Sequence, residues 1–185
     1  MNWYKKSQQD INQAYEDVMN QAAGITITGT GQSQTLDIPN MNYSINASDL
    51  LNNVKMRLAP TLVENNVQEI DTNPITDPNA QGLAVSSEPG KIYVDVQKIF
   101  EQATQSLPAT SQLDSVQPDP NATQEIIDQI SQMIEAEILE TVSHESWHMN
   151  QFSQEVQSTD PDFSKIEENP AEQFGQEMRQ QYFQY

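Results

Sequence analysis

The stretch "IIDQISQMIEAEILETVSHESWHMNQF" (residues 126–152) contains both histidines of this 185-residue chain. Its apolar residues recur at helical spacing, at Ile126, Ile127, Ile130, Met133, Ile134, Ile138, Leu139 and Val142. Because these positions fall mainly on one stripe, the pattern predicts a long amphipathic helix that begins near a cap at Asn121 and runs to about Phe152. His144 and His148 lie in the last turns of this helix.

The two histidines are four residues apart, and Glu145 directly follows the first of them. Four residues of helix give about 6 Å of rise and ~40° of rotation, so both imidazoles project from one face and can bind one ion. Glu145 is rotated by ~100°, which places it near a metal-activated water rather than on the metal. We therefore predict that His144 and His148 bind Zn²⁺ and that Glu145 is the general base. The simpler interpretation is a pair of exposed histidines on an ordinary helix.

Composition narrows the class of protein. The chain has 27 acidic and 8 basic residues, for a net charge of −19, so we expect no nucleic-acid partner and no attraction to anionic membranes. There is no cysteine, which excludes thiolate ligands and leaves imidazole and carboxylate to hold a metal. We find no signal peptide and no apolar run of membrane-spanning length, and we expect a cytoplasmic or virion-associated protein.

The remaining sequence predicts short helices and strands around the long helix. In the first half we expect a helix over 8–22, a hairpin over 25–38, and a helix from Ser48 or Asp49 that ends before Pro60. A short strand at 67–70 and a loop at 71–82 follow, and then a hairpin with a type II turn at Pro89 and Gly90, whose second strand is "KIYVD" (91–95). Next come a helix over 96–107, capped by Asp95, and a linker at 108–120. The expected fold class is α+β. We expect an accessory segment at 1–46 and a main domain at 47–185, together forming one compact unit.

The HExxH sequence at residues 144–148 resembles that of the zincin metallopeptidases. Thr141, Val142, Ser143, Ser146, Trp147 and Met149 fit the wider pattern of this family, whereas Asn150 replaces an expected hydrophobic residue. The resemblance implies a small mixed or antiparallel sheet packed on a backing helix and on the HExxH helix, followed by a C-terminal helix that carries a glutamate. It also implies that a peptide substrate lies antiparallel to the edge strand of the sheet, for which "KIYVD" is the candidate.

The class of zincin depends on the third metal ligand. Gln151 and Gln154 stand where the metzincins have Gly and His, so that class is excluded. The resemblance to small gluzincins implies Glu172 as the third ligand, in a Pro-x-Glu sequence that opens the last helix. Asn169, Pro170 and Glu172 also fit an N-cap, so Glu172 could be a capping residue instead. Other candidates for the third ligand are Asp160, Glu168 and Glu177.

The expected activity is that of a zinc metalloendopeptidase, which hydrolyses peptide bonds of a peptide or protein substrate by a zinc-activated water with Glu145 as base. Tyr182 and Tyr185 are candidates for stabilising the oxyanion, although terminal aromatic residues more often pack. The alternatives are a catalytically inactive zincin-fold module with a binding or structural role, for instance in a virus particle, and a metal-free acidic helical domain. The sequence does not indicate an oligomeric state.

Overall fold

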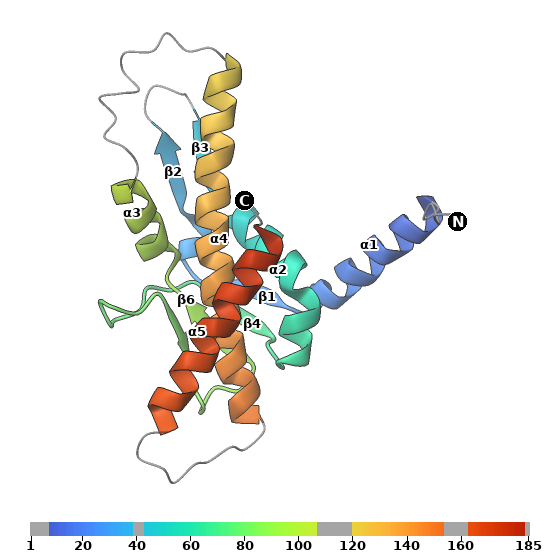
Figure 1. Cartoon of the computed structure of the whole chain (residues 1–185), viewed down its shortest axis with the longest axis vertical. Helices are drawn as coiled ribbons and strands as arrows, with labels where there is room; N and C mark the ends of the chain where they lie inside the picture. The colour runs from blue at the N-terminus through green and yellow to red at the C-terminus, as the bar shows by residue number, and fades with distance from the viewer. Residues whose placement is uncertain (1–7, 39–42, 107–119, 154–162, 184–185) are drawn as a thin grey trace.

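The computed structural model describes residues 8–38, 43–106, 120–153 and 163–183 (Figure 1). The elements in chain order are α1 (Gln8–Ala23), β1 (Thr26–Thr28), the 3-10 turn η1 (Gly31–Ser33), β2 (Thr35–Ile38), β3 (Tyr43–Asn46), α2 (Ala47–Glu64), β4 (Glu69–Asp71), β5 (Gly82–Ala84), β6 (Lys91–Val94), α3 (Val96–Ser106), α4 (Pro120–Ser153) and α5 (Phe163–Tyr182). The predicted α+β class is confirmed.

The main sheet is small and mixed. Its strand order is β1-β4-β6-β5, in which β1, β4 and β6 run parallel and β5 pairs antiparallel with β6. Strands β2 and β3 form a separate antiparallel pair. Among the described residues, β5 pairs with one strand only and is therefore an edge of the main sheet.

The long helix α4 is the centre of the fold. It contacts α2, α3, α5, β5 and β6, and Figure 1 shows α5 crossing over it while the first half of α1 projects away from the rest. Its apolar stripe is buried against α2 and the sheet, in a core that includes Leu51, Leu58, Leu62, Ile70, Ile92, Ile134, Ile138, Leu139 and Val142. The predicted amphipathic helix is therefore confirmed. Because its apolar side is buried in the core, the rotation of α4 about its own axis is determined.

Several local predictions are confirmed. The helix expected over 8–22 is α1, which ends one residue later. The N–H of Lys98 donates to Asp95 Oδ1 at 3.1 Å, as expected for a cap of α3. At the predicted type II turn the N–H of Lys91 donates to the carbonyl of Glu88 at 3.2 Å, and Gly90 has φ +84°. This turn joins β5 to β6 and so determines where β5 lies.

Two predictions about the first half of the chain are wrong. Strands β1 and β2 do not form a hairpin, because β1 pairs with β4 in the main sheet and β2 pairs with β3. The segment 1–46 therefore supplies a strand of the main sheet. The helix α2 also continues through Pro60 to Glu64. The complete burial of Leu62, at about 1.5–3 kcal/mol, offsets much of the penalty of about 3 kcal/mol for a proline within a helix.

A helix that crosses a membrane needs about 20 consecutive, predominantly apolar residues. In the described part of the chain, no helix combines the length and the apolar character that a membrane span requires. The long helix α4 is amphipathic and carries its apolar residues on the side that faces the core.

Candidate metal centre

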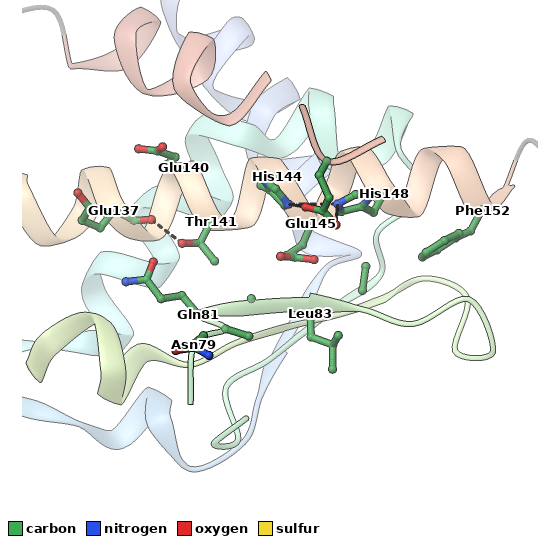
Figure 2. Close-up of a pocket in the computed structure, with 14 residues that line it drawn as sticks. Asn79, Gln81, Leu83, Glu137, Glu140, Thr141, His144, Glu145, His148 and Phe152 are labelled. Carbon is green, nitrogen blue, oxygen red and sulfur yellow. Dashed lines mark hydrogen bonds and ion pairs between the residues drawn. The ribbon is translucent and has the colours of Figure 1, made fainter. Parts of the chain in front are cut away.

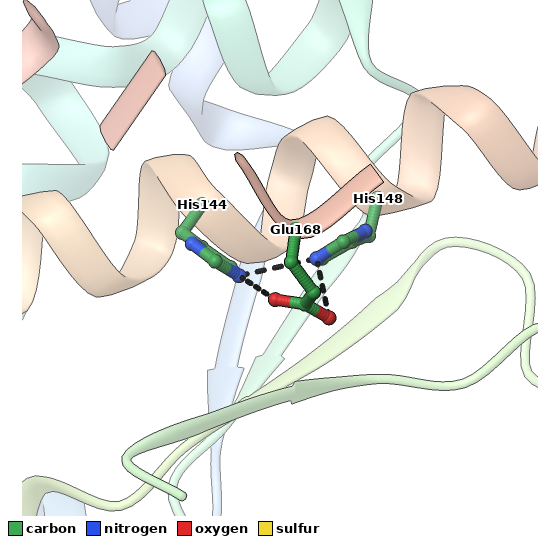
Figure 3. Close-up of side chains that lie close together, drawn as sticks. All are labelled: His144, His148 and Glu168. Atoms are coloured by element: carbon green, nitrogen blue, oxygen red, sulfur yellow. Dashed lines mark hydrogen bonds and ion pairs between the residues drawn. The ribbon is translucent and has the colours of Figure 1, made fainter. Parts of the chain in front are cut away.

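His144 and His148 converge on one point beside α4. Their Nε2 atoms are 3.1 Å apart, and the ring planes are inclined by 65° (Figure 3). Phe152 stacks on His148 with ring centroids 6.4 Å apart, and Trp147 contacts the same imidazole edge to face. These aromatic contacts restrict the orientation of the His148 ring, so one nitrogen of each imidazole is directed to a common point.

A carboxylate from α5 lies at the same point. Glu168 Oε2 is 3.4 Å from His144 Nε2, and Glu168 Oε1 is 3.7 Å from His148 Nε2. Figure 3 shows the carboxylate of Glu168 spanning the two imidazoles. One potential ligand atom from each of these three residues lies within 4.8 Å of the others, so the group could hold a metal ion.

The structure brings Glu168, and not the expected Glu172, to the two histidines. Glu172 is exposed and accepts a hydrogen bond from Gln176 Nε2 at 3.3 Å, and Glu177 pairs with Gln173. The difference arises because α5 begins at Phe163, so Pro170 lies inside the helix instead of opening it. This earlier start places Glu168 on the helix, one turn before Glu172, and it also removes Asn169 as an N-cap. Asp160 lies outside the described residues.

The spacing of the three groups fits a metal ion. Ligand atoms that bind a tetrahedral zinc ion at about 2.0–2.2 Å lie ~3.3–3.6 Å from one another. The two imidazole nitrogens are 3.1 Å apart, near that range. The two oxygens of Glu168 each approach a different imidazole, at 3.4 and 3.7 Å, and with one ligand atom per residue the three atoms lie within 4.8 Å of one another. Two imidazoles and one carboxylate suit zinc and also other first-row divalent ions. The donor set therefore supports a metal centre and does not by itself select the metal.

The back of the histidine-bearing turns is fixed by contacts with other elements. Asn65, at the end of α2, donates to Ser146 Oγ at 3.1 Å, and Ser146 Oγ donates to the carbonyl of Ser143 at 2.8 Å. The N–H of Gly90 in the β5–β6 turn donates to Met149 Sδ at 3.2 Å. Ser146 and Met149 are both buried. The contacts with the end of α2 and with the β5–β6 turn thus fix the rotation of α4 about its axis. In this rotation the side of α4 that carries the histidines faces away from these contacts.

Glu145 is buried between α4 and the edge strand β5, with 7% of its surface exposed (Figure 2). Burial, with an additional contribution from the negative charge of Glu168, raises the pKa of the Glu145 carboxyl to about 8, and a hydrogen bond from the Ala84 backbone opposes this rise. A cation bound beside Glu145 would lower its pKa again. The carboxyl is therefore placed where a metal ion would favour its basic form.

The edge strand beside Glu145 is β5, and the expectation that "KIYVD" forms the edge is wrong. That segment is β6, which lies between β4 and β5. The N–H of Asp95 donates to the carbonyl of Gln81, so by antiparallel alternation the backbone groups of Gly82 and Ala84 face away from β6. These groups face the cleft, where the Ala84 N–H reaches Glu145.

The cleft between α4 and β5 has a volume of about 550 Å³. One end is polar, with Asn79, Gln81, Glu137 and Glu140 in its wall, and Phe152 lies at the other end (Figure 2). His144, Glu145 and His148 lie between these ends, with Leu83 opposite them, and Glu168 lies beside the two histidines. Tyr182, an expected oxyanion candidate, does not line this cleft and donates to the carbonyl of Arg57 on α2 at 2.9 Å. Tyr185 lies outside the described residues.

Gly82 determines how closely β5 approaches Glu145. A Cβ atom at this position would lie 2.5 Å from Glu145 Oε1 and 2.8 Å from Thr141 Cγ2. We therefore expect Gly82→Ala to displace Glu145 or β5. For the peptide hydrolysis that the HExxH resemblance implies, we expect kcat/KM to fall by about 10- to 100-fold, as it does for misplacements near 1 Å. Gly24→Ala is the matched control, because a Cβ there meets nothing within 4 Å. Equal kcat/KM in both variants would show that this approach is not needed.

The structure brings the predicted residues His144, Glu145 and His148 together with Glu168. The sequence predicted the hairpin at Pro89 and Gly90 but did not show that its first strand, β5, is the sheet edge or that Gly82 and Ala84 face Glu145. The turn at Pro89 and Gly90 was the available signal for β5, because the strand that precedes a hairpin turn must pair with the strand that follows it. No protein-family model, curated protein or solved structure matches the chain.

Proposed function

We propose that this protein is a zinc-dependent peptidase in which His144, His148 and Glu168 hold the metal and Glu145 is the general base. The observation that carries the proposal is the convergence of the three potential ligands, with one ligand atom from each within 4.8 Å of the others, beside a buried carboxylate in an open cleft. The HExxH sequence and the α+β arrangement are consistent with the resemblance to zincins. A scaffold without activity would have no need for a buried carboxylate at position 145.

The chemistry follows from the positions of the side chains. When bound, zinc supplies Lewis acidity, which lowers the pKa of a water molecule and polarises the scissile carbonyl. The Glu145 carboxylate accepts a proton from the attacking water as the new C–O bond forms. The same carboxyl then donates this proton to the amide nitrogen as the C–N bond breaks. The products are a carboxylic acid and an amine, and Glu145 returns to its ionised form.

The substrate is an extended peptide segment that pairs with β5. The outward-facing N–H of Gly82 and the carbonyls of Gly82 and Ala84 can hydrogen-bond to such a segment, as an added strand does at a sheet edge, while the Ala84 N–H is engaged by Glu145. Pairing at this edge places the peptide backbone across the cleft, next to Glu145 and the histidines. Folded proteins rarely offer an extended strand, so flexible or unfolded chains are the preferred substrates.

Metal analysis and a protease assay on the same preparation test this function. Protein purified without chelator is expected to contain about one zinc per chain and to cleave an unfolded substrate such as casein. Chelation should abolish the cleavage, and added zinc should restore it. Protein that contains no zinc, and neither binds added zinc nor cleaves casein in its presence, would contradict the proposal.

A further inference from the structure

The third potential ligand is placed by its helix and not by packing around its side chain. The side chain of Glu168 is 64% exposed, and its carboxylate lies at ion-pair distance from the two imidazoles. His144 and His148, in contrast, belong to α4 and keep their spacing whenever α4 is helical. The distance from Glu168 to the imidazoles therefore depends on the separation between α5 and α4 and on the position of α5 along the axis of α4.

The helix α5 approaches α4 closely at Gly175. A Cβ atom at this position would lie 2.9 Å from the backbone oxygen of Glu140 and 3.3 Å from its Cγ. Ala171, one turn earlier on α5, is completely buried. Seven residues separate Glu168 from Gly175, which is about two turns, so both lie on the stripe of α5 that faces α4. The small residues let this stripe contact α4 directly.

An ion-pair cluster fixes the same contact along the helix axis. Arg179 Nη1 is 2.6 Å from Glu137 Oε1 and 2.7 Å from Glu140 Oε2. Glu140 thus contacts α5 twice, through its backbone at Gly175 and through its carboxylate at Arg179. Both contacts lie on the turns of α4 that directly precede His144. They link the position of α5 to the part of α4 that carries the histidines.

We propose that Gly175 and Arg179 are positioning residues for the metal centre. Gly175 sets the separation between α5 and α4, and Arg179 sets the position of α5 along α4, so together they place Glu168 beside His144 and His148. This inference rests on the proposed metal site. Metal ligands must lie within about 0.2 Å of their ideal distances, so a side chain that separates the helices at Gly175 weakens the site without touching a ligand. Loss of the Arg179 cluster removes the constraint on register.

Zinc affinity, measured by competition with a chromophoric chelator, tests the inference. Gly175→Ala is expected to weaken zinc binding by about 10-fold or more, in line with the 10- to 100-fold effects of residues that orient metal ligands. Arg179→Gln is expected to weaken it less, and Gly24→Ala not at all. Far-UV circular dichroism of the metal-free proteins checks that each variant is folded. Arg179→Gln adds no atom to the interface and keeps the test valid if Gly175→Ala does not fold.

A double-mutant cycle separates positioning from general destabilisation. Both substitutions should have little further effect, within about twofold, in a Glu168→Gln background, because they act through Glu168. Losses as large in that background as in the wild type would overturn the inference, as would wild-type affinity in both single variants. Failure of the proposed function has a different signature, since the wild-type protein would then bind no zinc and this inference would fall with it.

Discussion

The Glu145→Gln variant should retain its zinc and lose peptide hydrolysis. Glutamine has nearly the same shape as glutamate but cannot accept the proton of the attacking water, so the loss should be that of a general base, about 10²- to 10⁴-fold in kcat. The imidazoles and Glu168 are unchanged, so metal content should remain near one per chain. The measurement is the rate of cleavage of a fluorogenic peptide beside metal analysis of the same sample.

Glu125→Gln is the matched control for this experiment. It makes the same chemical change on the same helix, at an exposed position outside the cleft. Its rate and metal content should equal those of the wild type. If Glu145→Gln cleaves the peptide at the wild-type rate, then Glu145 is not the base and the cleavage follows another route.

Substitution of Glu168, the proposed third ligand, should have the second large effect, a loss of zinc affinity. Comparison with Glu172, one helical turn away, shows which of the two glutamates binds the metal. Glu168→Gln is expected to weaken zinc binding by more than about 100-fold, because loss of a partner that merely orients a ligand already costs 10- to 100-fold. Glu172→Gln is expected to change zinc affinity by less than about twofold. Its carboxylate is exposed and makes a helix-surface hydrogen bond with Gln176, worth a few tenths of a kcal/mol. Zinc titrations of the two variants provide the comparison.

Asp160→Asn belongs in the same titration series, because Asp160 is a further candidate from the sequence. Wild-type zinc affinity in this variant would agree with Glu168 as the third ligand. Loss of zinc by Glu172→Gln or Asp160→Asn, together with retention by Glu168→Gln, would contradict the arrangement of α5 described above.

The histidine pair could be predicted because it is a local feature. The spacing of His144 and His148 on a helix, and the rotation of Glu145 relative to them, follow from helix geometry once the apolar stripe has identified the helix. The same holds for the turn at Gly90 and for the cap at Asp95. Each of these depends on residues within a few positions of one another, and each is confirmed by the structure.

The third residue of the cluster depends on tertiary packing, and the sequence offered Glu168 only as a further candidate. The Pro-x-Glu resemblance to small gluzincins favoured Glu172, and Pro170 predicted a helix that begins there because proline is a frequent first residue of helices. The structure continues the helix through Pro170, with Ala171 completely buried against α4. Burial of the stripe that contains Ala171 and Gly175 decides where α5 lies, and the periodicity of α5 alone does not show which turn meets the histidines.

Strand pairing was the other feature that sequence did not predict. Alternation of apolar and polar residues indicated a strand at Thr26–Thr28 and another at Thr35–Ile38, but alternation does not identify partners. The first pairs in parallel with β4, which is about 40 residues away in the chain, and the second pairs with β3. The edge position of β5 follows from the same non-local order, in which β4 occupies the other side of β6.

The distribution of the cluster over two helices has a thermodynamic consequence. An ion held by His144, His148 and Glu168 is a cross-link between α4 and α5, and it binds fully only when these helices are docked. By linkage, such an ion stabilises the docked form by RT ln(1 + [M]/Kd), which is about 4 kcal/mol at a metal concentration 1,000 times Kd. That is a large part of the stability of a typical domain. The metal would therefore strengthen the docking of α5 that Ala171, Gly175 and Arg179 already provide, and its removal would weaken that docking.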